Sequence, residues 1–263
     1  MKTKETVKVH RAGISPAAVC PTALTLPERS VVLWVLDVLE KAWGMGKLSP
    51  VKAHEDPLDG LIVTILSQNT NDKNRDRASA QLKLRFSSWE EAAASSIEEL
   101  ASTIRAAGLG EVKARYINQA LKRIKERFGE YSLKGMKSWD KDKAKSFLLS
   151  LPGVGPKTAA CVLLFELGQP AFPVDTHITR VCKRIGWAPQ NTTSEDIQSI
   201  MEVAIPQEQY YSAHLNIIEH GRHICTARKP ACSSCPIISR CNFAGKTRRG
   251  EGQWAPSSFL SCD

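Results

Sequence analysis

Apolar residues recur at helical spacing along most of this chain, and the alternation that marks a half-buried β-strand is nowhere sustained. The spacing predicts helices over residues 31–39, 60–84 with a break near 68–72, 112–128, 141–149, 158–167, 176–185, 194–203 and 211–222. We therefore expect an all-α fold. A length of 263 residues suits one large domain or two modest lobes.

Short motifs indicate where helices begin. Pro27 can open the first helix, because proline fits a first helical turn. Asp59 is a candidate N-cap for a helix that starts near Gly60. The segments 88–91 and 96–99 both have the S-x-x-E form of a capping box, which predicts further helix starts after Ser88 and Ser96.

The chain is basic, with 36 Lys and Arg against 27 Asp and Glu, a net charge of +9. This surplus favours a polyanionic partner such as nucleic acid, although a basic protein without such a partner is an equal alternative on charge alone. We expect the helix over 112–128 to present its basic residues on an outer face: Lys113, Arg115, Lys122, Arg123, Lys125 and Arg127.

Both ends of the chain have the composition of polar tails, over residues 1–26 and 244–263. Residues 1–13 are charged and lack the apolar segment of a secretory signal. The longest apolar runs, 31–39 and 61–66, are too short or too interrupted to span a bilayer. We expect a cytoplasmic, nucleoid-associated protein of a prokaryote, with no membrane partner.

Four of the eight cysteines lie close together in the pattern Cys225-x6-Cys232-x2-Cys235-x5-Cys241. Four thiolates on a short loop can hold zinc or an iron–sulfur cluster. Zinc ribbons usually pair two Cys-x2-Cys knuckles, and only one such pair is present, so the spacing favours the cluster. We expect Cys161 and Cys182 to be buried helix residues, and Cys20 and Cys262 to lie in the tails.

The segment LPGVG at 151–155 separates two helical segments, the pattern of a helix-hairpin-helix. Gly153 and Gly155 permit left-handed backbone or the close approach of a partner. Lys157 and Thr158 open the next helix, where free N–H groups suit a DNA phosphate. Lys157 is either a phosphate contact or a nucleophile, whose free amine could attack C1′ of a deoxyribose and form a Schiff base.

Asp175 lies between an apolar segment and the helix predicted over 176–185. Its carboxylate could stabilise positive charge that develops on a sugar or assist proton transfer. The alternative is a plain N-cap, which the helical segment also supports. His177 could equally be a packing residue or a contact to phosphate or base.

Taken together, these motifs resemble the endonuclease III family of DNA glycosylases, over roughly residues 27–241. The matching segments are LIVTILSQNTND (61–72), AAGLGEVKA (106–114), LPGVGPKTA (151–159), VDTHITRVCKRIGW (174–187) and HGRHIC with the cysteine spacing (220–241). The resemblance implies an all-α, two-lobe helix-hairpin-helix fold. A six-helix barrel would occupy residues 50–169, and an iron–sulfur lobe would combine 27–49 with 170–243.

The resemblance also implies roles for individual residues. Lys157 matches the family's Schiff-base lysine and Asp175 its catalytic aspartate. The implied DNA-binding residues are Gln68, Asn69, Asp72, Leu109, Gly153, Val154, Gly155, Thr158 and His177, of which Gln68 or Asn69, Leu109 and His177 fill the gap left by a flipped base. The implied cofactor is a [4Fe–4S] cluster held by Cys225, Cys232, Cys235 and Cys241.

With lysine at 157, the expected activity is bifunctional: base removal followed by cleavage 3′ to the abasic site. The expected partner is double-stranded DNA with a damaged, mismatched or abasic nucleotide, bound by a monomer. The loop SQNTND (67–72) departs from the family's usual SAQATD and resembles the 5-methylcytosine and mismatch branch, so the excised pyrimidine stays open. The alternatives are a non-catalytic DNA-binding iron–sulfur protein and a zinc-containing nucleic-acid protein.

Overall fold

The computed structural model describes residues 26–47 and 53–244. Most of the two predicted tails, including Cys20 and Cys262, therefore lies outside the described residues. The prediction of an all-α fold is confirmed, because no strand occurs in this part of the chain. The helices are α1 (Arg29–Trp43), α2 (Pro57–Leu66), α3 (Asp72–Arg85), α4 (Trp89–Ala94), α5 (Ile97–Thr103), α6 (Gly110–Phe128), α7 (Lys141–Ser150), α8 (Pro156–Cys161), α9 (Thr176–Ile185), α10 (Ser194–Ala204) and α11 (Tyr210–His223).

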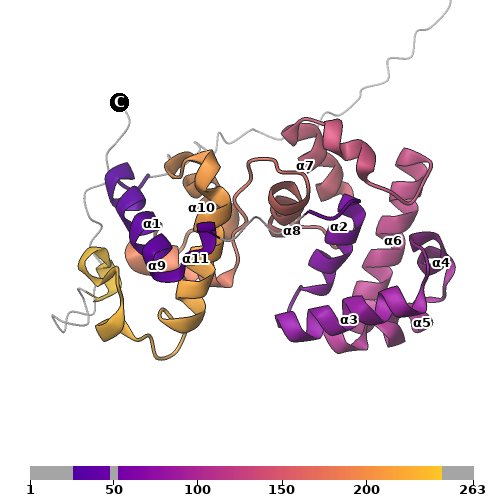
Figure 1. Ribbon diagram of the computed structural model, residues 1–263, viewed down its shortest axis with the longest axis horizontal. Helices are drawn as coiled ribbons and strands as arrows, with labels where there is room; N and C mark the ends of the chain where they lie inside the picture. Colours follow the sequence, from indigo (N-terminus) through magenta and orange to yellow (C-terminus); the bar gives the residue numbers. More distant parts are fainter. Residues whose placement is uncertain (1–25, 48–52, 245–263) are drawn as a thin grey trace, which may run out of the picture.

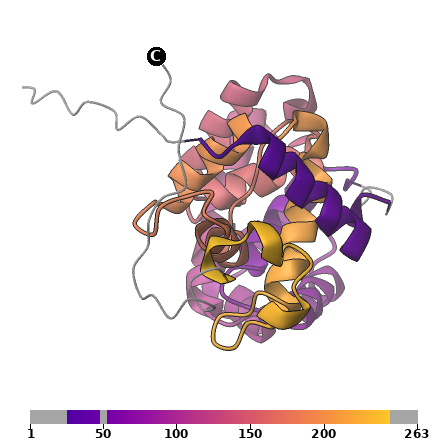
Figure 2. The same ribbon diagram turned by 90° about the vertical axis from the view of Figure 1, so that its left-hand side faces the viewer.

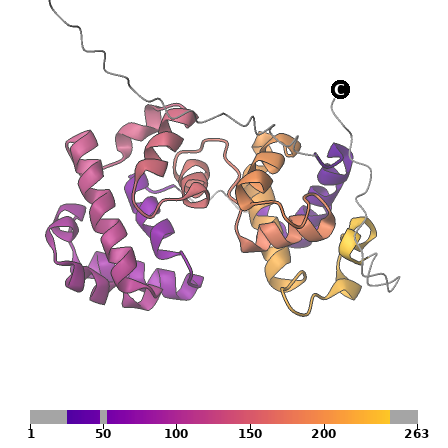
Figure 3. The ribbon, with the colours of Figure 1, turned by 180° about the vertical axis from the view of Figure 1, so that it is seen from behind.

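The helices form two bodies side by side, each with its own hydrophobic core (Figure 1). The first core draws on α2 to α8, and the second on α1 together with α9, α10 and α11. The chain passes from the first to the second between Ala171 and Phe172, both fully buried. The view from behind shows the same division, with α8 facing the second body (Figure 3). None of the described helices is long and apolar enough to cross a bilayer.

Two predicted helix starts are wrong by a few residues. The N-cap of α2 is Asp56, whose Oδ1 accepts hydrogen bonds from the N–H of Leu58 and of Leu133, both at 2.9 Å. Asp59 lies in the first turn instead and accepts from the indole of Trp89 at 2.7 Å. Helix α1 begins at Arg29, two residues after Pro27, with Glu28 at its N-cap position.

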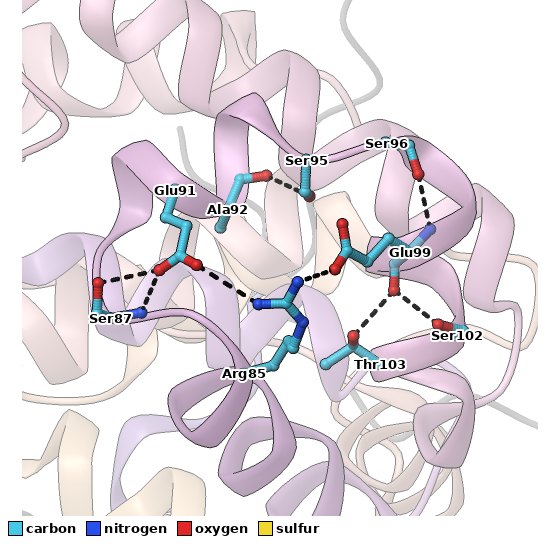
Figure 4. A network of polar contacts seen from close by, with 9 residues as sticks. All are labelled: Arg85, Ser87, Glu91, Ala92, Ser95, Ser96, Glu99, Ser102 and Thr103. Atoms are coloured by element: carbon cyan, nitrogen blue, oxygen red, sulfur yellow. Dashed lines mark hydrogen bonds and ion pairs between the residues drawn. The ribbon is translucent and has the colours of Figure 1, made fainter.

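The hydroxyls of Ser88 and Ser96 cap α4 and α5 as predicted, each accepting a backbone N–H at 3.1 Å. The side chains of the two glutamates have other partners, as the contacts of Glu91 with Ser87 and of Glu99 with Arg85 show (Figure 4). Glu91 accepts from the N–H and the hydroxyl of Ser87, and both Glu91 and Glu99 bind Arg85 of α3. Arg85 thereby joins three helices of the first body.

One predicted surface residue is wrong. Lys113 was expected on the outer, basic face of α6, but it is buried, with 1% of its surface exposed. Helical geometry explains this, because Lys113 precedes Ile117 by four residues and Leu121 by eight, which places it on the apolar face.

Candidate active site and metal centre

The hairpin between α7 and α8 is a tight turn whose shape depends on one glycine. Gly153 has φ +76°, and a Cβ at this position would lie 2.4 Å from the ring of Tyr116, so a side chain is excluded twice. Val154 is buried in the first core, so only its backbone faces outward. Gly155 has ordinary φ, and nothing lies within 4 Å of where its Cβ would be, which leaves open space beside the backbone.

Lys157 follows the hairpin, in the first turn of α8, and is half-buried. One turn later, Cys161 is confirmed as a buried helix residue. Burial raises the pKa of the Cys161 thiol, the charge of Lys157 and a hydrogen bond with it oppose this increase, and the charge of Asp175 adds to it. Lys157 and Asp175 therefore both lie within electrostatic reach of Cys161.

Asp175 is the N-cap of α9, where its Oδ1 accepts the N–H of Ile178 at 2.8 Å. The plain structural role considered for this residue is therefore real. A carboxylate has a second oxygen, so the cap does not exhaust its capacity for other partners.

His214 of α11 is buried, and the charges of both predicted catalytic residues reach it. Its Nδ1 lies 2.9 Å from the carbonyl oxygen of Pro173, and its ring packs edge-on against Phe165 and Phe172. Burial lowers the pKa of His214 to about 4, which the charge of Asp175 opposes and the charge of Lys157 reinforces. At neutral pH the imidazole is therefore uncharged.

The loops that precede α3 and α6 carry three of the predicted DNA-binding residues. Gln68 turns inward, and its Nε2 donates to the carbonyl of Gly153 at 2.8 Å and to the hydroxyl of buried Thr158 at 3.2 Å. Asn69 and Leu109 are exposed, and both have left-handed backbone, with φ of +52° and +51°. Of the pair Gln68 and Asn69, Asn69 is the exposed residue, whereas Gln68 is partly buried and its amide is bonded inside the protein.

Asp72 and His177 are tied to the second body through arginines. Asp72 forms an ion pair across the two bodies with Arg222 of α11, at 3.2 Å. Nδ1 of His177 lies 3.1 Å from the guanidinium of Arg180. Gly221 of α11 makes room for this pair, since a Cβ there would be 3.0 Å from Cβ of His177.

Cys225, Cys232, Cys235 and Cys241 line a single cavity at the end of the second body, which Figure 2 views end-on. Arg184 of α9 holds the loop that carries them, donating to Sγ of Cys225 at 3.4 Å and to the carbonyls of Thr226 and Ala227 at 2.7 and 2.8 Å. Burial raises the pKa of Cys235 to about 11, so its bare thiol is protonated at neutral pH.

The donor set fits a [4Fe–4S] cluster, which takes four thiolates. Within the described ranges, no group of three or more His, Cys, Asp or Glu side chains is placed to hold a single metal ion. The four cysteines nevertheless face one cavity, whose remaining wall is largely apolar, as a multi-atom group requires. Nε2 of His220 lies 3.7 Å from Sγ of Cys235 and can serve as an outer hydrogen-bond partner.

Three residues around the site were missed or misplaced by reasoning on the sequence. Cys161 was predicted as a buried helix residue, but its place beside Lys157 was not; that could have been found, because Cys161 follows Lys157 by four residues and shares its helix face. Lys113 could have been placed by the same rule. His214 carried no sequence signal, since α11 reaches α9 and the π-helix at Val162–Glu166 only through the tertiary fold.

Residues 62–207 match the HhH-GPD superfamily of base excision DNA repair proteins, and residues 225–241 match the iron–sulfur binding domain of endonuclease III. Endonuclease III of Thermotoga maritima is 32% identical over 198 residues, which are 75% of this chain and 87% of that protein. A DNA glycosylase/AP lyase of Arabidopsis thaliana is 33% identical over 170 residues, or 58% of this chain. The chain spans only 12% of the length of that plant relative. A solved endonuclease III–DNA covalent intermediate superposes with a TM-score of 0.73 and 29% identity, covering 85% of this chain and all of the other.

Proposed function

Because this chain belongs to the endonuclease III family, within the HhH-GPD superfamily of base excision repair glycosylases, we propose that it removes a pyrimidine from DNA through a Schiff base on Lys157 and then cuts the strand. One observation carries the proposal. Lys157 from the first body and Asp175 from the second act on the same two buried groups, Cys161 and His214. This supports the proposal that the nucleophile and the carboxylate act together where the two bodies join.

The proposed reaction uses these two side chains. The free amine of Lys157 attacks C1′ as the bond from C1′ to the base breaks, and the base leaves with a proton. Asp175 stabilises the positive charge that develops on the sugar. Once the sugar ring has opened to the Schiff base, loss of a proton from C2′ expels the 3′ phosphate.

The hairpin and the two exposed loops supply the DNA contacts in this account. The backbone at Gly153 and Gly155 approaches phosphate, while Asn69 and Leu109 enter the gap left by the flipped nucleotide. The single-residue roles of Asp72 and His177 are part of the same proposal. When bound, the cluster would fix its loop at four cysteines. Base excision followed by elimination involves no net oxidation or reduction, so the reaction needs no electron transfer from the cluster.

We propose an oxidised pyrimidine, or a thymine or uracil opposite guanine, as the substrate. A panel of defined duplexes tests this: thymine glycol, uracil or thymine opposite guanine, 5-methylcytosine and a preformed abasic site, each under single-turnover conditions. We expect base release from one pyrimidine class and strand cleavage at the abasic site. Tight, salt-dependent binding with neither event would contradict the proposal and indicate a non-catalytic DNA-binding protein.

The predicted monomeric state and prokaryotic origin stay predictions. Relatives occur in plants as well as in bacteria and an archaeon.

A further inference from the structure

Lys113 is a buried lysine of the first body whose hydrogen bonds go to backbone carbonyls and not to a carboxylate. Its Nζ donates to two backbone carbonyl oxygens, of Leu66 and of Ala107, each at 2.8 Å. Burial lowers the pKa of Lys113. A buried lysine is costly, so its presence here calls for a reason.

The two carbonyls belong to the two segments that lead into the exposed loops. Leu66 is the last residue of α2, three residues before Asn69, and Ala107 ends a 3-10 turn (Arg105–Ala107), two residues before Leu109. Asn69 and Leu109 are the two residues other than glycine with positive φ in the part of the chain described. Such backbone persists only where the surroundings hold it.

A lysine suits this position chemically. It offers three donors and no acceptor, so one side chain can satisfy carbonyls from two segments at once. The carbonyl of Leu66 lies at the negative end of the α2 dipole, which favours a cation. Gln68 extends the connection from the first loop to the hairpin, through its bonds to Gly153 and Thr158.

We propose that Lys113 is a positioning residue, which holds Asn69 and Leu109 at the spacing needed to enter the DNA gap together. Lys113 touches no DNA itself. The inference rests on the proposed function, because it assigns the two loops to the gap left by a flipped nucleotide.

The test uses the full-length protein, with Lys113→Met, Lys113→Arg and, as a matched control, Lys122→Met at an exposed position on the same helix. The first readout needs no chemistry. The duplex carries a tetrahydrofuran abasic analogue with 2-aminopurine in the opposite strand, whose fluorescence rises when the base loses its stacking neighbours. We expect a rise with the native protein and with Lys122→Met, and a much smaller rise with Lys113→Met at saturating protein.

The second readout compares base release with cleavage of a preformed abasic site, where no base has to be flipped. We expect Lys113→Met to slow base release by roughly 10- to 100-fold while cleavage of the abasic site falls far less. Lys113→Arg keeps the positive charge on a planar guanidinium group. We therefore expect a smaller loss of base release, again with abasic-site cleavage affected less. This variant decides the matter if the methionine variant does not fold.

Equal losses in both reactions, or no loss in either, would overturn the proposal, as would the absence of a fluorescence rise with the native protein. A native protein that releases no base but still raises the fluorescence would contradict the proposed function alone.

Discussion

Asp175 has a structural role in the fold and, in the proposed function, a second role in the reaction. One carboxylate oxygen caps α9, and the charge reaches the buried groups beside Lys157. A loss of activity on removing the carboxylate could therefore come from either role, and the two roles need a variant that separates them.

Asp175→Asn separates them, because asparagine caps helices about as well as aspartate does. We expect unfolding stability within about 1 kcal/mol of the native protein and base release slower by roughly 10²- to 10⁴-fold, measured by urea titration and single-turnover kinetics. Thr193→Asn, at the N-cap of α10, is the control and should leave both quantities unchanged. Native base release by Asp175→Asn would show that Asp175 serves only as the N-cap of α9.

His214 makes stability depend on pH. Its pKa of about 4 in the fold lies below its ordinary value of 6.5, because burial disfavours the charged form. The unfolded chain therefore binds a proton first as the pH falls, and stability is lost between pH 6.5 and 4. The charged groups that act on His214 are Asp175, Lys157 and Arg222.

We expect His214→Gln to reduce the slope of unfolding free energy against pH in this window, by at most about 1.4 kcal/mol per pH unit for the single proton involved. Urea titrations at several pH values measure it. His223→Gln removes an exposed histidine of the same helix and should leave the slope unchanged. Identical slopes for native and His214→Gln proteins would show that His214 titrates normally.

At the scale of elements, the hairpin contains two glycines that differ in what their positions require. Gly153 is required by its backbone angle and by Tyr116. Gly155 meets neither requirement. It is the N-cap of α8, and the open space beside it gives room for the DNA backbone in the proposed function.

We expect Gly155→Ala to weaken binding to abasic-analogue DNA and to lower unfolding stability by no more than about 1 kcal/mol, because alanine is a poorer N-cap than glycine. Gly153→Ala should destabilise the protein by roughly 1–3 kcal/mol, through strain at positive φ and the overlap with Tyr116. Thermal unfolding and fluorescence anisotropy measure the two effects. Undiminished DNA affinity in Gly155→Ala would contradict close approach at the hairpin.

The loop after α11 depends on α9 for its shape, since Arg184 bonds to the cysteine Cys225 and to the two residues after it. We expect Arg184→Met to lose iron and sulfide during purification, because three contacts to the loop disappear together. Arg228→Met, at an exposed position of the same loop, is the matched control and should retain native iron, sulfide and visible absorbance. Full retention in Arg184→Met would show that the four thiolates alone fix the loop.

A helix could be predicted correctly from the sequence where its start and stop are set by neighbouring residues in the chain. Helix α9 occupies the predicted residues 176–185, because its cap at Asp175 and its stop at Gly186 are local signals. The helix predicted over 158–167 instead starts at Pro156 and changes to a π-helix at Val162–Glu166. There Glu166 packs against Gly60 and accepts the N–H of His54 at 3.0 Å, contacts distant in sequence that no local pattern contains.

At the scale of the whole molecule, the described chain starts with α1 in the second body, builds the first body from α2 to α8 and then returns to the second (Figure 1). Helical periodicity cannot say which helices share a core, so the two-lobe arrangement came from the family resemblance. The same crossing brings Lys157 and Asp175, from different bodies, to the groups Cys161 and His214. The candidate residues were readable from motifs and Cys161 from helix spacing, whereas the place of His214 required the fold.

Borohydride trapping tests the central claim most directly. Reduction of a Schiff base converts it to a stable amine, so abasic DNA incubated with the protein and sodium borohydride should give a covalent adduct whose modified peptide contains Lys157. Lys157→Ala should give no adduct, while Lys122→Ala should give the native amount. An undiminished adduct from Lys157→Ala, or none from the native protein, would contradict the proposed mechanism.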